Sequence, residues 1–97
     1  MATCILLASY TDQGVRNIKD TTKRADAFRA LAKHMGAQVK DIYWTLGAYD
    51  IVAIVEAADE SVITALGLAL AKSGNVRLQT LKAFAQAEMD AILGKVI

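Results

Sequence analysis

The sequence predicts an α+β fold in one domain, residues 1–97, with the element order β-α-β-β-α-β and a further helix at the C-terminus. Short apolar runs alternate with longer stretches of helical periodicity, which is the first observation behind this prediction. The second is that two stretches of similar length, Asp20–Gly36 and Asp59–Gly74, each begin at a capping residue and end at a glycine. The third is the Gly47-Ala48-Tyr49-Asp50 motif, which marks a tight hairpin between the two halves.

Four segments have the length and the β-branched or aromatic content of strands: Cys4–Tyr10, Val39–Leu46, Ile51–Ala57 and Val76–Phe84. The first is apolar on both of its faces, which indicates cover on both sides of the sheet. The third is the most apolar and is predicted to be central, whereas Lys40 and Asp41 in the second are typical of an edge strand. Gly47-Ala48 is expected to fill the two central positions of a type II′ turn, which requires glycine first.

Three helices are predicted between and after the strands. The first, residues 20–36, places Phe28 and Leu31 on an apolar stripe together with the charged Arg24. The second, Asp59–Ser73, is apolar nearly all round, which predicts contact with another subunit. The last spans about Gln86–Lys95.

The order of the elements determines the predicted topology. Two βαβ units joined by a hairpin give the split βαβ, or ferredoxin-like, fold. Right-handed crossovers place the two main helices on one side of a four-stranded antiparallel sheet. The other side remains apolar on every strand, and the last helix is too short to cover it. We therefore expect a homodimer with facing sheets, or a higher oligomer.

Composition excludes several classes of function. Hydrophobic residues make up 55% of the chain, above the usual share of about 45–50%, which favours a protein–protein interface. The net charge of +1 and the lack of an apolar run of roughly 18 residues predict neither a nucleic-acid nor a membrane partner. The single cysteine, Cys4, fits a reducing compartment, and we expect a cytoplasmic protein. No ligand spacing for a metal occurs, and no cofactor is expected.

Two charged residues in apolar surroundings lead to the site predictions. Arg24 is expected to meet a carboxylate, with Asp50 and Glu56 available, or to extend to the rim of the sheet. Glu56 interrupts an apolar strand, and Arg77 and Gln79 are its expected partners. If these three residues line one cavity together with Tyr10 and either Tyr43 or Trp44, it would bind a small polar-aromatic ligand, and the alternative is a satisfied polar cluster at a dimer interface. The other candidate ligand-binding or interface residues are Tyr10, Tyr43, Trp44 and Tyr49.

Several motifs resemble the GYD domain family, whose Gly-x-Tyr-Asp hairpin is here Gly47, Tyr49 and Asp50. Other matching segments are Thr11-Asp12-Gln13-Gly14, Lys23-Arg24, Tyr43-Trp44-Thr45-Leu46, Glu56-Ala57-Ala58-Asp59, Gly74-Asn75-Val76-Arg77 and Leu81-Lys82-Ala83-Phe84. The resemblance covers about residues 4–93 and departs at Ala58, where family members more often have proline. It implies a dimeric α+β barrel with sheets paired face to face, and no established activity. The hairpin is also similar to one in the effector-binding domain of leucine-responsive bacterial regulators, which bind small amino acids at oligomer interfaces.

The preferred hypothesis is a non-enzymatic, homo-oligomeric domain that binds a small molecule or a partner at its subunit interface. A small cofactor-independent enzyme of the oxygenase or isomerase type, with an inter-sheet cavity, is the first alternative. Arg24, Glu56, His34 and Tyr10 would then be its acid–base groups, and a carboxylate and an arginine converging in a closed cavity would favour it. The second alternative is a structural or regulatory subunit without a ligand. No residue is assigned a catalytic role.

Overall fold

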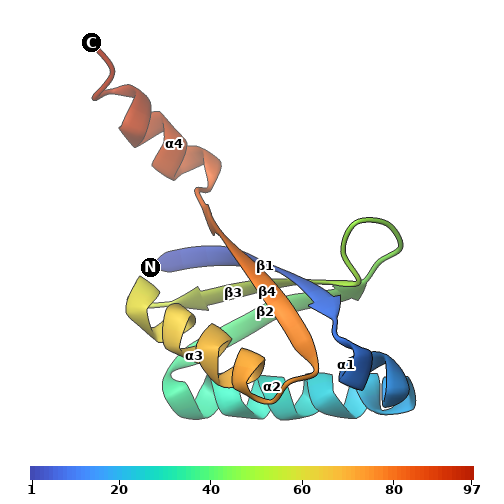
Figure 1. Cartoon of the computed structure of the whole chain (residues 1–97). Coiled ribbons are helices and arrows are strands. Elements are labelled where there is room, and N and C mark those ends of the chain that lie inside the picture. Colours follow the sequence, from blue (N-terminus) through green and yellow to red (C-terminus); the bar gives the residue numbers. More distant parts are fainter.

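A computed structural model describes residues 1–97 and confirms the predicted ferredoxin-like fold. Its strands are β1 (Ala2–Tyr10), β2 (Ala37–Trp44), β3 (Ile51–Ala57) and β4 (Val76–Ala83). Its helices are α1 (Asp12–Arg16), α2 (Thr21–Met35), α3 (Glu60–Lys72) and α4 (Gln86–Leu93), with a 3-10 turn, η1 (Ile18–Asp20), before α2. Figure 1 shows α2 and α3 along one face of the sheet, while no helix lies over the other face.

The strands pair antiparallel in the order β2-β3-β1-β4, so that β1 and β3 are central and β2 is an edge, as predicted. The register places Cys4 opposite Val55 and Leu6 opposite Ala53. Because side chains alternate between the two faces of a strand, this register decides which residues face the helices.

The hydrophobic core lies between the sheet and the helices α2 and α3. Alternate residues of β1 and β3, among them Leu6 and Val55, are buried in one cluster with Phe28 of α2 and with Ile63 and Leu66 of α3. Burying a side chain of this size stabilises the fold by about 1.5–3 kcal/mol. Only 15 of the 97 residues are buried, so each of these contacts is a large part of a modest core.

Two helix ends carry the predicted signals, whereas Asp20, a predicted cap of α2, makes no side-chain capping hydrogen bond. The Asp59 carboxylate accepts a hydrogen bond from Ser61 N at 2.9 Å and caps α3. Gly36 ends α2 with a φ of 88°, a left-handed conformation that glycine adopts without strain.

The structure corrects the sequence predictions at two connections. The stretch after β1, for which the sequence predicted no helix, contains the short helix α1, whose Gly14 N donates to the Thr11 hydroxyl at 3.2 Å. The two-residue type II′ turn at Gly47-Ala48 is wrong: β2 and β3 separate after the Trp44–Ile51 pair, and residues 45–50 form a wider loop. Thr45 N donates to Asp50 O at 2.8 Å across the base of this loop, which closes the hairpin earlier than predicted.

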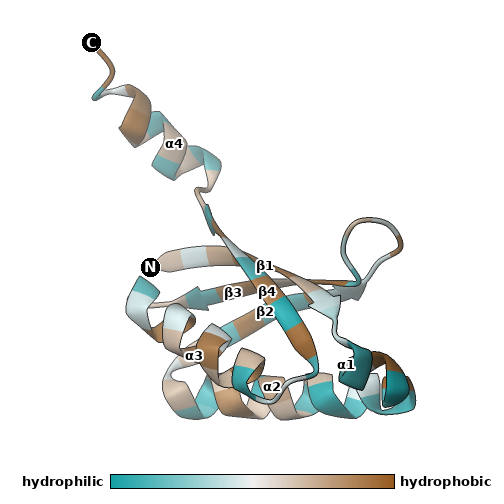
Figure 2. Ribbon diagram, viewed as in Figure 1, coloured by the Kyte–Doolittle hydropathy of each residue, from teal (hydrophilic) through white to brown (hydrophobic).

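The C-terminal helix α4 does not cover the sheet. It continues from the end of β4 and extends away from the body of the molecule, as Figure 1 shows. Met89 and Leu93 on α4, and Val96 and Ile97 after it, are exposed apolar side chains, and Figure 2 shows hydrophobic residues along this helix. None of the helices has the length and apolar character needed to cross a membrane.

Candidate functional site

The face of the sheet turned away from α2 and α3 is the first candidate site, and we call it the open face. Its centre is apolar and consists of Ile5, Leu7, Val52, Ile54 and Leu81, which the register places side by side on three adjacent strands. Leu81 is 39% exposed and the other four are partly exposed. An uncovered apolar surface of this kind is typical of an interaction site.

Polar candidates surround this apolar centre. Tyr43 of β2, Glu56 of β3, and Arg77 and Gln79 of β4 lie on the open face by register. Tyr49 reaches across from the hairpin, and its hydroxyl donates to Gln79 Oε1. The structure therefore brings Tyr49 and Gln79 together, although the sequence prediction linked Gln79 to Glu56.

Glu56 does not meet Arg77. Glu56 lies opposite Thr3 and Arg77 lies opposite Ser9, six residues away along β1, which is about 20 Å at roughly 3.4 Å per residue. Tyr10 and Trp44 belong to the opposite, helix-facing side, because they pair with Val76 and Ile51. The predicted single cavity containing all these residues is therefore wrong, and the strand register is the reason.

Asp50 has a structural position at the end of the hairpin. Its carboxylate accepts a hydrogen bond from Tyr10 N at 2.9 Å, and its own N–H donates to Ala8 O at 2.9 Å. The last paired residues of β1 and β3 are Ala8 and Ile51. The Asp50 side chain thus supplies the acceptor that a longer β3 would have given to the end of β1.

The predicted ion pair of Arg24 with Asp50 or Glu56 is wrong. Arg24 donates instead to two backbone carbonyl oxygens, Asn17 O at 2.7 Å and Gly14 O at 3.4 Å. These carbonyls belong to α1 and the residue that ends it, a segment absent from the sequence prediction. Asp50 is engaged with Tyr10, and Glu56 lies on the other face of the sheet.

The residues predicted as acid–base groups of an enzyme do not converge. Glu56 lies on the open face, whereas Tyr10 and Arg24 lie on the helix side of the sheet. His34 is exposed in the last turn of α2. No group of three or more His, Cys, Asp or Glu side chains is placed to hold a metal ion.

A second candidate site, which sequence reasoning missed, is a cavity of about 250 Å³ between the sheet and the helices α2 and α3. Tyr10, Arg24 and Trp44 line it together with Thr21. The Thr21 hydroxyl is hydrogen-bonded to Tyr10 OH at 2.9 Å and accepts from Trp44 Nε1 at 3.0 Å. The sequence does carry a signal for this site, because helical spacing places the Thr21 hydroxyl on the same stripe as Arg24 and Phe28.

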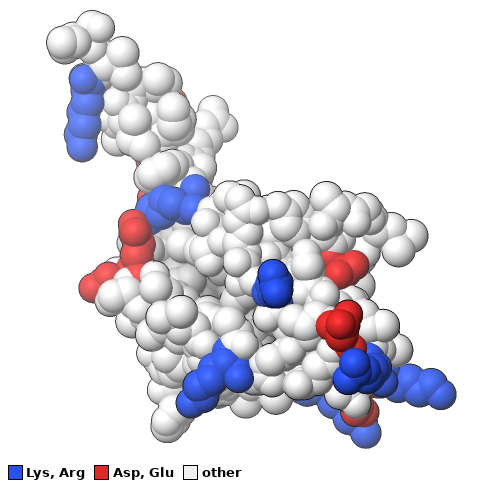
Figure 3. Space-filling model, in the orientation of Figure 1, with Lys and Arg blue, Asp and Glu red and all other residues white.

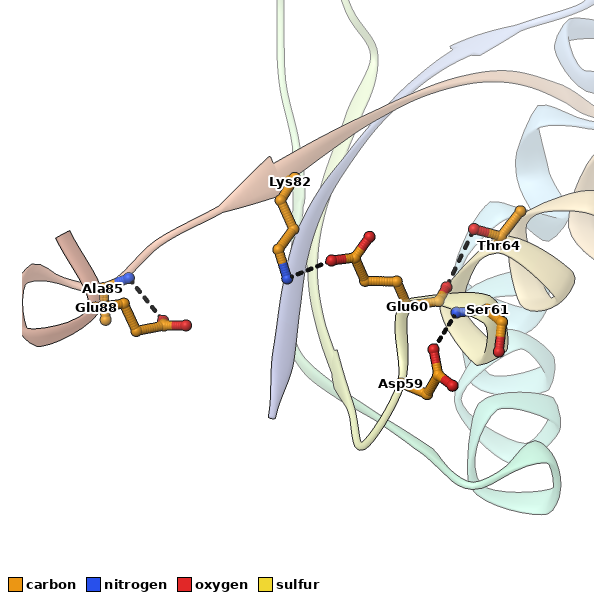
Figure 4. A network of polar contacts seen from close by, with 7 residues as sticks. All are labelled: Asp59, Glu60, Ser61, Thr64, Lys82, Ala85 and Glu88. Carbon is orange, nitrogen blue, oxygen red and sulfur yellow. Dashed lines mark hydrogen bonds and ion pairs between the residues drawn. The ribbon is translucent and has the colours of Figure 1, made fainter. Parts of the chain in front are cut away.

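The polar contacts at the other end of the molecule are structural. Figure 4 shows Lys82 of β4 against Glu60 of α3, with Nζ and Oε1 2.9 Å apart. This hydrogen bond raises the pKa of Lys82, and burial raises the pKa of the nearby Cys4 thiol. Figure 3 shows charges of both signs interspersed on the face in view, without an extended patch of one sign.

Comparison with known proteins shows that the chain matches one protein family. The family model of the GYD domain matches residues 4–93. The chain belongs to the GYD domain family. A relative from Thermus thermophilus, named as a glutamine synthetase and cystathionine beta-lyase binding protein, is 34% identical over 94 residues, which cover 96% of this chain and 99% of that protein. No solved structure matches the chain significantly. This GYD domain chain is therefore similar along its whole length to a protein named for binding other proteins.

Proposed function

We propose that this GYD domain chain is a protein-interaction domain that self-associates through the open face of its sheet and binds other proteins as an assembly. The observation that carries this proposal is the uncovered apolar centre of the open face, from Ile54 on β3 to Leu81 on β4. Sheets of globular proteins bury at least one face, and an apolar second face is stable in water only when it is covered.

A second copy of the chain is the occupant that the charges on this face favour. Glu56 lies toward one end of the open face and Arg77 toward the other. Two copies related by a twofold axis present identical patches to each other. Such a pairing can bring opposite charges together around an apolar centre, and this arrangement gives specificity to an interface.

The exposed helix α4 is an independent reason to expect that a second copy of the chain is the partner. This helix extends beyond the end of β4 and away from the sheet (Figure 1), and its apolar side chains Met89 and Leu93 are exposed. An isolated helix of eight residues is marginal in water, because most helix stability in proteins comes from packing. A neighbouring copy would provide the surface on which α4 packs.

The name of the Thermus thermophilus relative supports the second half of the proposal, which is that the assembly binds other proteins. We propose that enzymes of amino-acid metabolism, of the kind named for that relative, are partners of this chain as well. The buried free thiol of Cys4 agrees with the cytoplasmic location expected for such partners.

Sedimentation velocity at micromolar concentration tests the self-association. We expect a dimer or larger assembly for the natural chain. Leu81→Asp places a carboxylate in the centre of the open face and should weaken association at least about tenfold, because a buried charge without a partner is costly. Val15→Asp is the matched control, since Val15 lies on α1, which is part of neither the open face nor α3, and is 57% exposed. Circular dichroism establishes that both variants are folded.

Two results would contradict the self-association. One is a folded natural chain that sediments as a monomer at tens of micromolar. The other is equal weakening by Leu81→Asp and Val15→Asp, because the open face would then have no special role. For the partners, size-exclusion chromatography with purified glutamine synthetase and cystathionine beta-lyase should give co-elution with at least one. If neither enzyme co-elutes with the intact assembly, the proposed partners are rejected. The proposed self-association is not affected by that result.

A further inference from the structure

The cavity between the sheet and the two main helices is not used by the proposed function. It lies on the opposite side of the sheet from the open face, within one subunit. Of its 18 lining residues 14 are hydrophobic, including Leu6, Phe28 and Ile42. Small side chains from three elements, Ala25, Ala53 and Ala69, also line it and leave its centre unfilled.

The polar lining residues are concentrated at one end of this cavity. Thr21 and Arg24 lie in the first turn of α2, and Ser73 and Asn75 lie between α3 and β4. Tyr10, at the end of β1, joins this group through its hydrogen bond to Thr21. The deeper wall comes from residues in the middle of the strands, such as Leu6 and Ala53. The cavity therefore has an apolar interior and a polar end.

Arg24 is the charged residue of the lining, and no carboxylate lines the cavity with it. A guanidinium has five N–H donors, and those of Arg24 make two hydrogen bonds, both to neutral backbone carbonyls. Arg24 is partly buried. It makes no ion pair, since the ion pair of the chain joins Lys82 to Glu60. A cation with free donors at the end of an apolar cavity is suited to a carboxylate, which a guanidinium binds strongly.

We infer that this cavity binds a small aromatic or branched aliphatic carboxylate, with the apolar part between the sheet and α2 and the carboxylate at Arg24. The volume of about 250 Å³ is slightly below the roughly 300–1,000 Å³ of pockets for drug-sized ligands. At about 30 Å³ per water-sized group, it holds on the order of eight such groups, close to the size of phenylacetate. Apolar cavities of comparable or smaller size bind aromatic molecules such as benzene.

Trp44 makes the binding measurable. It is the only tryptophan of the chain and it lines the cavity, so its fluorescence reports on occupation. Titration with phenylacetate should change this fluorescence saturably in the millimolar range or below. Phenethylamine, which has a similar apolar part and the opposite charge, should bind at least about tenfold more weakly, because its ammonium would lie against the Arg24 guanidinium. Benzyl alcohol serves as the neutral probe.

Two variants locate the site. Arg24→Gln should weaken phenylacetate binding about tenfold and leave benzyl alcohol within twofold. Arg29→Gln is the matched control, since Arg29 is also on α2 and also donates to a backbone carbonyl, Val39 O at 3.4 Å, but does not line the cavity. Ala69→Leu fills the cavity and should abolish binding of both probes. If Ala69→Leu does not fold, Ala25→Val narrows the same space from α2.

The outcomes are distinct from those of the proposed function. The absence of a saturable response to phenylacetate up to 10 mM (an order-of-magnitude ceiling for weak ligands) overturns the inference. Equal binding of phenethylamine overturns the assignment of a carboxylate, and unchanged binding by folded Ala69→Leu overturns the location. Sedimentation of Ala69→Leu should match the natural chain, because the open face is untouched. Loss of ligand binding with retained self-association would therefore support both inferences separately.

Discussion

Replacement of Asp50 by alanine tests the structural role assigned to the hairpin. Alanine keeps the backbone hydrogen bond from residue 50 N to Ala8 O but removes the carboxylate that accepts from Tyr10 N at 2.9 Å. A hydrogen bond to a charged group contributes about 1.5–3 kcal/mol, and the half-buried Tyr10 N–H would lose its acceptor. We therefore expect the free energy of unfolding to fall by about 2 kcal/mol. For a domain of this size that corresponds to a melting temperature lower by about 8–16 °C.

Two further variants make this prediction specific. Asp50→Asn keeps an acceptor oxygen and should cost only about 1 kcal/mol, the difference between a hydrogen bond to a charged group and a neutral one. Asp26→Asn, at an exposed position of α2, should change stability by less than about 0.5 kcal/mol. Urea and thermal denaturation followed by circular dichroism, at one fixed protein concentration, give the three values. If Asp50→Ala were as stable as the natural chain, or if the alanine and asparagine variants were equal, the hydrogen bond to Tyr10 would not carry the stability assigned to it.

Four other predictions concern the core and its borders. Gly14→Ala should destabilise the chain by at least about 2 kcal/mol in thermal denaturation, because a Cβ at Gly14 would lie 2.1 Å from the backbone oxygen of Asn75. Leu66→Ala should cost about 2–5 kcal/mol, since Leu66 is fully buried, and a loss below 1 kcal/mol would contradict the described core. Cys4 should react with a thiol reagent far more slowly in the folded than in the unfolded chain, because it is buried and its pKa is raised. The same raised pKa means that the folded state keeps a proton that the unfolded state releases, so the free energy of unfolding should fall as pH rises above the ordinary thiol value of about 8.5. This alkaline loss should be smaller in Cys4→Ala, where only the raised pKa of Lys82 remains.

The fold could be predicted because local and global signals agree. The glycine and aspartate signals at Gly36 and Asp59 mark helix ends that the structure has. The lengths of the apolar runs separated strands from helices. The hairpin was misjudged because glycine first in a pair indicates a two-residue turn, whereas here the Asp50 side chain completes the pairing and allows a wider loop. Helix α1 was missed because five residues are too few for a periodic pattern.

The candidate sites were harder to predict, since they depend on register and on distance through space. A strand pattern assigns Glu56 and Arg77 to faces only after the pairing partners are known, and the two residues then lie at opposite ends of one face. Arg24 was expected to find a carboxylate, but two nearby carbonyl oxygens satisfy part of its hydrogen-bonding capacity. The cavity arises from alanines on three separate elements. Because these alanines are far apart in the sequence, no sequence pattern indicates that their side chains line one cavity.

The position of β1 in the middle of the sheet has a consequence for how the chain folds. Tyr10 of β1 pairs with Val76 of β4, so the sheet is completed only when residues far apart in the sequence meet. Such long-range pairing slows folding. During synthesis at about 5–20 residues per second, β1 would wait roughly 3–13 s for β4, with the backbone N–H and C=O groups along one of its edges unpaired. We therefore expect truncation within β4 to unfold the whole chain, and newly made chains to be most prone to aggregation before their last strand leaves the ribosome.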